Sequence, residues 1–485
     1  MRRLSICMLV LLAVITASAQ QRIPCDRSQR DGTAATRAGD SRLYHSIPWE
    51  GTVHIPVILA AYSDVGFQTS DAEQRASWDA KLNQVGYAEH GAVGSAADYF
   101  RKQSGGRLNV VFDVLGPVTL PNTRVYYGGN KNDKASEDQH AEDMIIHACE
   151  ACDADFSPYD NDGDGLIDLV LVIYAGNGEN RGGPADAVWP HKYVVPGSHK
   201  VGGLLLGDYI CVSELEKSGR EDGHGVICHE FSHALGLPDI YPIGSDLFSL
   251  FDEWDLMDGG DYTNYGYSPP NYSAFERSLV GWVELKELSE ATVVTGMPAW
   301  DDEPVAYAVY NSYDREEYLI LENRQQRGYD SFVPGNGLIV TYVNHYYHGL
   351  SPNIYNMYQV TLIASDNRTY SDYKELYGSA MYTDEGRNRY LSMSAYPYIE
   401  EGELRNDAVA TTTTPANPLK KDITNIRMAA DGTISFDFKN ESTGIAATPS
   451  ALQEDDAWYD LYGRRLQGKP SRKGIYLHNK KKVAL

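Results

Sequence analysis

The sequence predicts two large domains, a mixed α/β domain over residues 51–288 and an all-β, sandwich-like domain over residues 289–440. Three observations lead to this prediction. The chain has 485 residues, which is more than one hydrophobic core usually accommodates. Up to residue 288, apolar runs typical of buried strands alternate with segments of helical periodicity. Beyond that point, short strand-like segments between turn residues replace the helical pattern.

The elements of the first domain follow from hydrophobic patterning. Residues 54–61 and 166–175 are continuous apolar runs of the kind found in the middle of a sheet. Ser104 and the two glycines after it mark the end of one helical segment. We expect strands at 54–61, 108–115 and 166–175, and helices at 71–85, 94–103 and 137–150.

The elements of the second domain are predicted to be strands. We expect them at 292–295, 306–310, 318–321, 337–343, 359–363 and 433–438. Residues 441–457 are rich in small and acidic residues and are predicted to be a linker. Residues 458–485 form a separate C-terminal tail that contains Lys480, Lys481 and Lys482.

The N-terminal residues have the pattern of a secretory signal peptide. Arg2 and Arg3 precede an apolar stretch, and Ala17-Ser18-Ala19 provides a cleavage pattern of small residues. We therefore predict a signal peptide at 1–19, a short prosegment or linker at 20–50, and a secreted or cell-surface protein without a membrane span after signal removal.

The charge and cysteine content narrow the class of protein further. Lys and Arg number 42 against 67 Asp and Glu, which gives a net charge of −25, so nucleic acid is not expected as a partner. Export permits disulfides, but removing Cys7 with the signal peptide leaves five of the six cysteines, an odd number. Disulfides are therefore not expected to be the main framework.

The motif that indicates chemistry lies in residues 225–239, GVICHEFSHALGLPD. On a helix, His229 and His233 are one turn apart and can bind one zinc ion, while Glu230 lies at the edge of the same face and can act as a base. Gly236 and Pro238 then end the helix, so that Asp239 can turn back as a third ligand. A fourth position would remain for water.

This motif is specific. With 13 histidines in the chain, a chance His-Glu-x-x-His pattern is expected about 0.02 times. The alternative is an ordinary helix with two surface histidines. The apolar residues on the opposite side of the helix, which would pack it onto the domain, favour the zinc site.

The long form His-Glu-x-x-His-x-x-Gly-x-x-Asp resembles that of the immune inhibitor A-like zinc metallopeptidases, relatives of the metzincins. Further segments resemble the family in the same order along the chain, and the resemblance covers about residues 51–345. These segments are GSAADYF at 94–100, GPVT at 116–119, YYG at 126–128, YDNDGDGLID at 159–168, VWPHK at 188–192, WDLM at 254–257, EYLILENR at 317–324 and GNGLI at 335–339.

The resemblance implies a metzincin-like zincin fold for the first domain and a peptidase activity. His229, His233 and Asp239 would be the zinc ligands, Glu230 the general base and acid, and Met257 a structural residue of a Met-turn beneath the metal. Zinc would polarise the peptide carbonyl and activate a water molecule. Metzincins often carry a Tyr two residues after this Met, where this chain has Gly259, so Tyr262 and Tyr265 are candidate substitutes.

A second metal motif lies at residues 160–168. Carboxylates occupy positions 1, 3, 5 and 9 of a calcium-type loop, and a main-chain carbonyl is available at position 7. The alternative is an acidic turn without a metal, because position 12 lacks the carboxylate of an EF-hand. The candidate calcium ligands are Asp160, Asp162, Asp164, Leu166 and Asp168.

Weaker candidates remain open. Cys25 in the prosegment is a candidate latency ligand for zinc. Cys228 is either a core residue or a disulfide partner of Cys211, and His191 either lines the cleft or packs in a loop. The tail resembles the sorting tails of proteins exported by type IX secretion, which would make the secretion machinery a partner; a plain terminal hairpin is the alternative.

The functional prediction is a secreted, calcium-stabilised zinc endopeptidase that cleaves extracellular proteins or peptides. Two other classes remain. One is a surface binding protein with a degenerate peptidase domain, against which the intact Glu230 speaks. The other is a zinc hydrolase that acts on a non-peptide bond.

Overall fold

The structure is a computed structural model of the chain. It describes residues 45–131, 137–241, 251–345, 360–368, 391–409 and 421–439, with a few residues between these ranges and short stretches of the last 30 residues. The predicted signal peptide and residues 20–44 lie outside the described residues. Residues 1–440 and 441–485 are two separate compact units.

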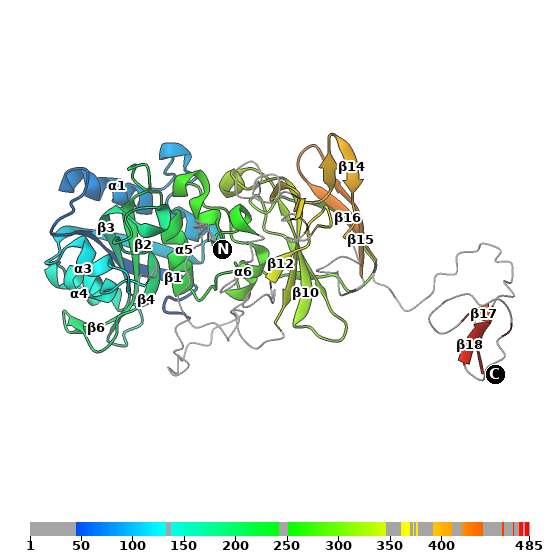
Figure 1. The fold of residues 1–485 in the computed structure, drawn as a ribbon, viewed down its shortest axis with the longest axis horizontal. Helices are drawn as coiled ribbons and strands as arrows, with labels where there is room; N and C mark the ends of the chain where they lie inside the picture. The colour runs from blue at the N-terminus through cyan, green and yellow to red at the C-terminus, as the bar shows by residue number, and fades with distance from the viewer. Residues whose placement is uncertain are drawn as a thin grey trace, which may run out of the picture. The chain divides into compact units, whose positions relative to one another are not determined.

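The first half of the larger unit is built on a six-stranded sheet in the order β2-β1-β3-β6-β4, with β5 paired to β6 (Figure 1). The strands β2, β1, β3 and β6 are parallel, whereas β4 is antiparallel to β6 and lies at the end of the order. The strands are β1 (Gly51–Ala61), β2 (Leu108–Thr119), β3 (Leu166–Asn177), β4 (His191–Val194), β5 (Lys200–Val201) and β6 (Leu204–Leu215).

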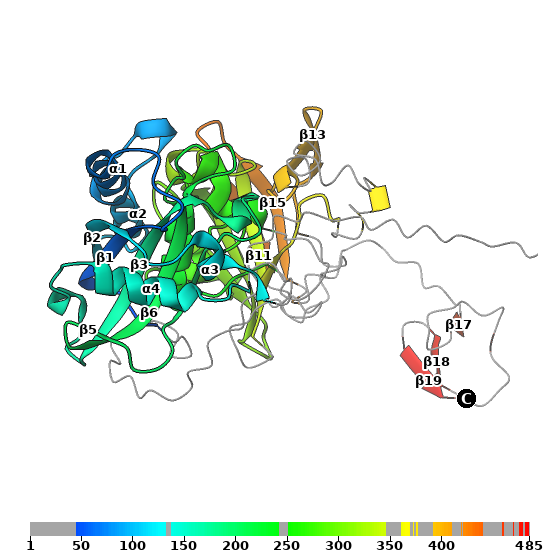
Figure 2. The same cartoon turned by 60° about the vertical axis from the view of Figure 1, so that its left-hand side comes forward.

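Helices pack on both faces of this sheet, as expected for parallel strands that are buried on both sides (Figure 2). Side chains of α1, α2 and α5 join one apolar cluster with one face, and side chains of α4 join a second cluster with the other face. The helices are α1 (Asp71–Asn83), α2 (Ala96–Gln103), α3 (Arg124–Gly128), α4 (Ala141–Ala151), α5 (Gly225–Ala234) and α6 (Ala274–Leu279).

The second half of the larger unit consists mainly of strands. A five-stranded sheet has the order β12-β11-β10-β9-β7, a three-stranded sheet has the order β15-β16-β8, and β13 and β14 form a hairpin. The strands are β7 (Lys286–Glu287), β8 (Thr292–Met297), β9 (Ala306–Tyr310), β10 (Glu317–Arg324), β11 (Gly337–Asn344), β12 (Val360–Leu362), β13 (Tyr398–Glu400), β14 (Glu403–Asn406), β15 (Asp422–Met428) and β16 (Ile434–Lys439).

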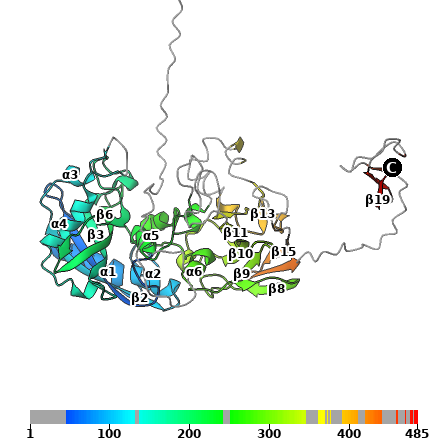
Figure 3. The same ribbon diagram turned by 90° about the horizontal axis from the view of Figure 1, so that it is seen from below.

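The five-stranded sheet joins the two halves, because each of its faces belongs to a different core. Along β10, Tyr318 and Ile320 pack into the cluster that contains the helix α5, whereas Leu319 and Leu321 pack against the three-stranded sheet. This alternation is the period-2 pattern of a strand buried on both faces. Viewed from below, α5 and α6 lie between the first sheet and the strands β9 and β10 (Figure 3). The domain boundary at residue 288 stays a prediction, since the hydrophobic core continues across it.

The smaller unit contains one three-stranded sheet in its described residues, in the order β17-β18-β19. Its strands are β17 (Trp458–Tyr459), β18 (Ile475–His478) and β19 (Lys481–Ala484). In the part of the chain that the structure describes, no helix is both long enough and apolar enough to cross a membrane.

Candidate metal centre

The helix α5 carries the two histidines and ends where the sequence predicts. Ile227, Phe231 and Ala234 face the core and hold the helix on the sheet. The helix stops at Leu235, and Gly236 follows with φ of 92°, a left-handed conformation that glycine adopts without strain. This turn redirects the chain toward the histidines.

Asp239 returns to the two histidines, as predicted. Its Oδ1 lies 3.2 Å from Nε2 of His229 and 3.3 Å from Nε2 of His233. Ligand atoms bound to zinc at about 2.0–2.1 Å in a tetrahedron are separated by roughly 3.3 Å. All three ligand atoms lie within 4.8 Å of one another. The spacing and the donor types therefore fit zinc.

Main-chain carbonyls orient both imidazole rings. Nδ1 of His229 donates to the Leu256 carbonyl at 2.8 Å, and Nδ1 of His233 donates to the Leu237 carbonyl at 2.8 Å. These bonds place the proton on Nδ1 and leave each Nε2 free to bind a metal. Met257 is fully buried, and its carbonyl accepts from the Ile240 amide, next to Asp239. Residues 256–257, where the sequence predicts a Met-turn, thus support two of the three predicted ligands.

The electrostatics of the site also suit a cation. Burial disfavours protonated His229, but the hydrogen bond to Asp239 and the charge of Glu230 outweigh it and raise the pKa of His229 to about 10. Burial opposes ionisation of Asp239 as well, yet the two histidines hold its pKa well below its usual range. Burial raises the pKa of Glu230, and the histidine charges counteract only part of this shift. A metal at this position would replace the proton on His229.

Comparisons with known proteins agree with this geometry. Residues 73–283 match the family model described as immune inhibitor A peptidase M6, catalytic domain. This segment is therefore similar to the catalytic domain of a peptidase family.

Two curated relatives support the assignment of this metallopeptidase domain. Immune inhibitor A of Bacillus thuringiensis subsp. alesti is 24% identical over 373 residues, which is 66% of this chain and 53% of that protein. The pre-pro-metalloprotease PrtV of Vibrio cholerae serotype O1, strain M66-2, is 26% identical over 230 residues, or 40% of this chain and 25% of that protein. The aligned region therefore spans about half of the first relative and a quarter of the second.

The peptidase domain contains site residues that the sequence analysis did not single out. The hydroxyl group of Tyr241 hydrogen-bonds to Asp239. Asp261 is buried close enough to His229 and Glu230 for their charges to affect its pKa, and its Oδ1 has no hydrogen-bond partner among the described residues. A Cβ on Gly225 would lie 2.1 Å from the main-chain oxygen of Asp261, so the loop after Met257 packs directly on the start of α5. The glycine at position 225 is the one sequence feature that could have indicated this close packing.

The two tyrosines proposed as substitutes for the metzincin Tyr have different environments. Tyr262 is half-buried, accepts a hydrogen bond from Asn180 at 3.3 Å and packs against the guanidinium of Arg181. Tyr265 is exposed and stacks on Arg220. Tyr262 is therefore tied to the loop beyond β3, whereas Tyr265 faces solvent.

The acidic loop of the peptidase domain gathers three of the predicted calcium ligands. Carboxylate oxygens of Asp160, Asp162 and Asp164 lie within 4.8 Å of one another. Asp168 is not part of this group, because its Oδ2 accepts hydrogen bonds from the main-chain and side-chain nitrogens of Asn161 at 2.9 and 3.0 Å. Leu166 begins β3, and its amide donates to Asp164.

The weaker candidates are also placed. Cys228 and Cys211 are buried free thiols in different apolar clusters, so they do not form a disulfide with each other. His191 is buried and bonds to the Trp189 carbonyl and the Tyr209 hydroxyl, which makes it a packed residue. Cys25 lies outside the described residues.

The residues just before β1 hold the end of α5. The amides of Ser46 and Ile47 both donate to the Ala234 carbonyl, at 2.9 and 3.2 Å, and Nε1 of Trp49 donates to the Leu235 carbonyl at 2.8 Å. These carbonyls have no partner within the helix. We call residues 45–50 the N-terminal arm. It belongs to the segment predicted as prosegment or linker, yet it completes the peptidase domain.

Proposed function

We propose that the chain is a secreted zinc-dependent endopeptidase that hydrolyses peptide bonds in extracellular proteins. The observation that carries this proposal is the convergence of His229, His233 and Asp239 at spacings suited to zinc, with Glu230 beside them. The zinc ligands would be these two histidines and Asp239. The metzincin-like class of the domain and the sandwich-like class of the β-rich half are part of the same proposal.

A zinc ion held by these residues would supply a Lewis acid that polarises a carbonyl group and lowers the pKa of water. The chain itself supplies the base. One oxygen of Glu230, Oε2, has no hydrogen-bond partner among the described residues, while the carboxylate also accepts a bond from the Lys192 amide. Glu230 is thus fixed and still has a free oxygen to accept a proton from water and return it to the leaving amine.

The strand β4 offers a binding mode for an extended peptide. It ends the order of the first sheet, and its residue Lys192 contacts Glu230 through the main chain. Edge strands bind peptides by adding a strand to the sheet. We infer that substrate lies along β4, which would bring its main chain close to Glu230.

Calcium at the acidic loop is a second part of the proposal. Asp160 accepts hydrogen bonds from the amides of Gly163, Asp164 and Gly165, which orders the loop that precedes β3. A calcium ion would neutralise the three neighbouring carboxylates. Asp168 would act on the loop through Asn161 rather than as a ligand.

Export by the predicted signal peptide at 1–19, with the tail at 458–485 as a sorting signal, would bring the enzyme to its extracellular substrates. The two other classes, a surface binding protein with a degenerate peptidase domain and a zinc hydrolase of a non-peptide bond, make different predictions in the same assay.

The test compares the wild type with Glu230→Gln, which keeps the shape of the side chain and removes the base. We expect about one zinc per chain in both proteins, and digestion of denatured casein that falls by about 10²–10⁴-fold in the variant. The acidic loop is tested separately, by measuring the calcium content of the wild type and of Asp162→Asn.

Each of the other outcomes supports a different function or contradicts the proposal. Zinc without cleavage of any protein favours a non-peptide substrate or a degenerate site. Equal cleavage by both proteins removes Glu230 as the base. A folded wild-type chain that binds no zinc overturns the proposal.

A further inference from the structure

A buried ion-pair cluster lies in the β-rich half, beyond residue 283, where the match to the catalytic-domain model ends. Arg324 at the end of β10 donates to both carboxylate oxygens of Asp330, at 2.7 and 2.8 Å, and to Glu322 at 3.2 Å. All three side chains are at most 2% exposed. Burying three charges is costly unless each makes several bonds, and an apolar core would serve packing alone equally well. The partners of this cluster therefore indicate what it does.

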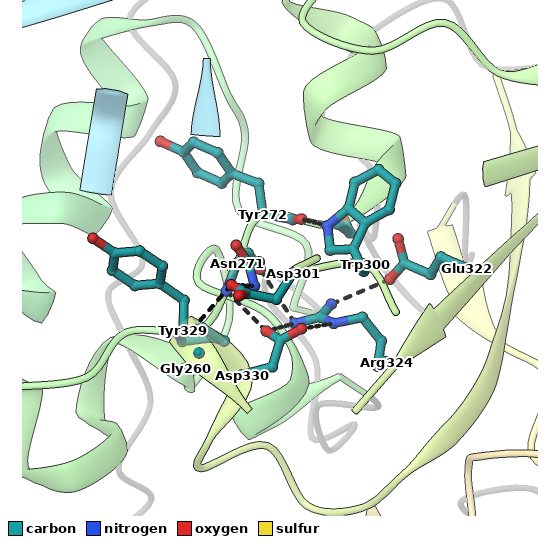
Figure 4. A network of polar contacts seen from close by, with 12 residues as sticks. Gly260, Asn271, Tyr272, Trp300, Asp301, Glu322, Arg324, Tyr329 and Asp330 are labelled. Carbon is teal, nitrogen blue, oxygen red and sulfur yellow. Dashed lines mark hydrogen bonds and ion pairs between the residues drawn. The ribbon is translucent and has the colours of Figure 1, made fainter. Parts of the chain in front are cut away.

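The cluster binds the main chain of residues 271–274, at the start of α6. The Asp330 carboxylate accepts from the Asn271 amide at 3.0 Å, and Arg324 donates to the Asn271 carbonyl at 3.3 Å. Glu322 accepts from the Ala274 amide at 2.5 Å. Figure 4 shows Arg324 between Glu322 and Asp330, with Asn271 beside them. Residues beyond 289 thus hold a segment that lies within the peptidase domain.

Two further residues of the β-rich half also form hydrogen bonds with residues 271–274. Nε1 of Trp300 donates to the Tyr272 carbonyl at 2.7 Å, and Asp301 accepts from the side-chain amide of Asn271 at 2.9 Å (Figure 4). Four main-chain groups of residues 271–274 are therefore bonded by side chains from the β-rich half. This number of bonds fixes the segment in one position.

The same segment contacts the helix that carries the zinc ligands. Tyr272 is fully buried, and its hydroxyl hydrogen-bonds to the hydroxyl of Ser232, the residue before His233 on α5. Ser232 in turn donates to the Cys228 carbonyl at 2.6 Å, so Tyr272 is the donor to Ser232. A chain of bonds therefore runs from Arg324 through Asn271 and Tyr272 to α5.

A second connection reaches the Met-turn. Glu276 of α6 hydrogen-bonds to Asp255, and Asp255 accepts from the Met257 amide at 2.8 Å. The Leu256 carbonyl between them orients His229. The segment 271–276 therefore supports the metal site from the helix side and from the Met-turn side.

We propose that Arg324 and Tyr272 are positioning residues for the metal ligands, so that the β-rich half sets the metal affinity of the peptidase domain. This inference rests on the proposed zinc site. Neither residue contacts the ligands; each acts through the segment 271–276, which holds α5 and the Met-turn in register. Metal sites lose affinity when the groups that orient their ligands are changed, because the ligand geometry is then no longer preset.

The test measures zinc affinity by competition with a chromogenic chelator on the full chain, at pH 7 and well below every unfolding midpoint. Tyr272→Phe keeps the ring and removes the hydroxyl, and Arg324→Lys keeps the charge and removes the forked bond to Asp330. We expect each to weaken zinc binding by about tenfold. The double variant should weaken it by less than the product, because both changes interrupt one chain of bonds.

Tyr396→Phe is the matched control, because Tyr396 is a buried tyrosine of the β-rich half whose hydroxyl donates to the Ala364 carbonyl. It should lower the unfolding midpoint and leave the zinc affinity unchanged. If Arg324→Lys does not fold, Tyr272→Phe alone decides the result.

The outcomes separate this inference from the proposed function. A wild type that binds no zinc overturns both. A wild type that binds zinc, with variants that match its affinity to within about twofold and only unfold earlier, overturns the positioning role alone. Fully multiplicative effects in the double variant contradict the shared path through residues 271–276.

Discussion

At the scale of single residues, the metal site combines features that a sequence carries with features that it does not. The spacing of His229 and His233 on one helix predicts both ligands, and Gly236 predicts the turn that returns Asp239. The carbonyls of Leu256 and Leu237 were not predictable, since any residue has a carbonyl and only the fold selects which one faces a ring. Tyr241 and Asp261 were missed because neither belongs to the zinc motif and only the fold brings their side chains close to it.

The charge of His229 leads to a prediction about metal binding. Its raised pKa of about 10 means that, without metal, the ring is protonated at pH 7; this stabilising charge is fully present below pH 6.5 and is lost as the pH rises through 10. Zinc needs the neutral ring. We therefore expect about one proton to be released per zinc at pH 7 and fewer as the pH approaches 10.

Titration calorimetry in two buffers with different ionisation enthalpies measures this number. The Glu230→Gln variant keeps the contact between His229 and Asp239 but removes one of the charges that raise the pKa of His229, so it should release no more protons than the wild type. Binding without proton release would show that His229 is already neutral.

At the scale of elements, hydrophobic patterning predicted the strands β1 to β3, β8 to β12 and β16 and four of the described α-helices, and it missed elements whose position depends on tertiary contacts. The predicted helix at 137–150 begins only at Ala141, because Asp138 pairs with Asn130 and accepts from the Trp189 amide. One of the missed elements is the strand β6, which lies between β3 and β4 in the first sheet. Its alternation is broken by Gly207 and by Asp208, whose charge is neutralised by Lys192 at 2.6 Å.

The contact between α6 and the Met-turn contains a shared proton. Burial raises the pKa of both Glu276 and Asp255, and their carboxyl groups bond to each other, which requires one proton between them. Stability from this pair is present at pH below about 4 and is lost as the pH rises through the folded-state pKa values, by roughly 1.4 kcal/mol per pH unit for one proton. Glu276→Gln, whose amide donates to Asp255 without a proton, should gain stability relative to the wild type as the pH rises above about 4.

Denaturant unfolding at several pH values measures the difference. Glu73→Gln is the matched control, because Glu73 forms the same capping box with Ser70 at the start of α1 but is exposed. That variant should show no such gain. A parallel response of Glu276→Gln and the wild type would mean that the pair holds no proton.

At the scale of the whole molecule, the boundaries that a sequence indicates differ from those of the folded core. Strand patterns beyond residue 289 look like a separate module, yet Ala306, Tyr318 and Ile320 pack into the cluster that contains α5. The sequence does not reveal which face of a strand packs on which partner. Tyr318 and Leu319 are consecutive apolar residues, yet Tyr318 packs into the cluster that contains α5 and Leu319 packs against the three-stranded sheet. The predicted linker, in contrast, begins at residue 441, where the smaller compact unit starts.

Shortened chains check this organisation. A chain that ends at residue 440 should keep the zinc affinity and the unfolding midpoint of the larger unit, because the smaller unit is separate from it. A chain that ends at residue 288 loses Arg324, Trp300 and one side of the shared core, and we expect no cooperative unfolding transition and no tight zinc binding. Calorimetry and chelator competition on both chains give the answer. A folded, zinc-binding chain of 288 residues would contradict the shared core.

The N-terminal arm has a consequence for maturation. The arm donates hydrogen bonds to the Ala234 and Leu235 carbonyls at the end of α5. A protease that trims the chain from its start would remove these bonds once it passes residue 45. Trp282 would lose its partner as well, since its indole nitrogen donates to the Trp49 carbonyl at 2.9 Å. We therefore expect that a chain cut upstream of His45 keeps these bonds to the end of α5, whereas a cut within the arm removes them and weakens zinc binding.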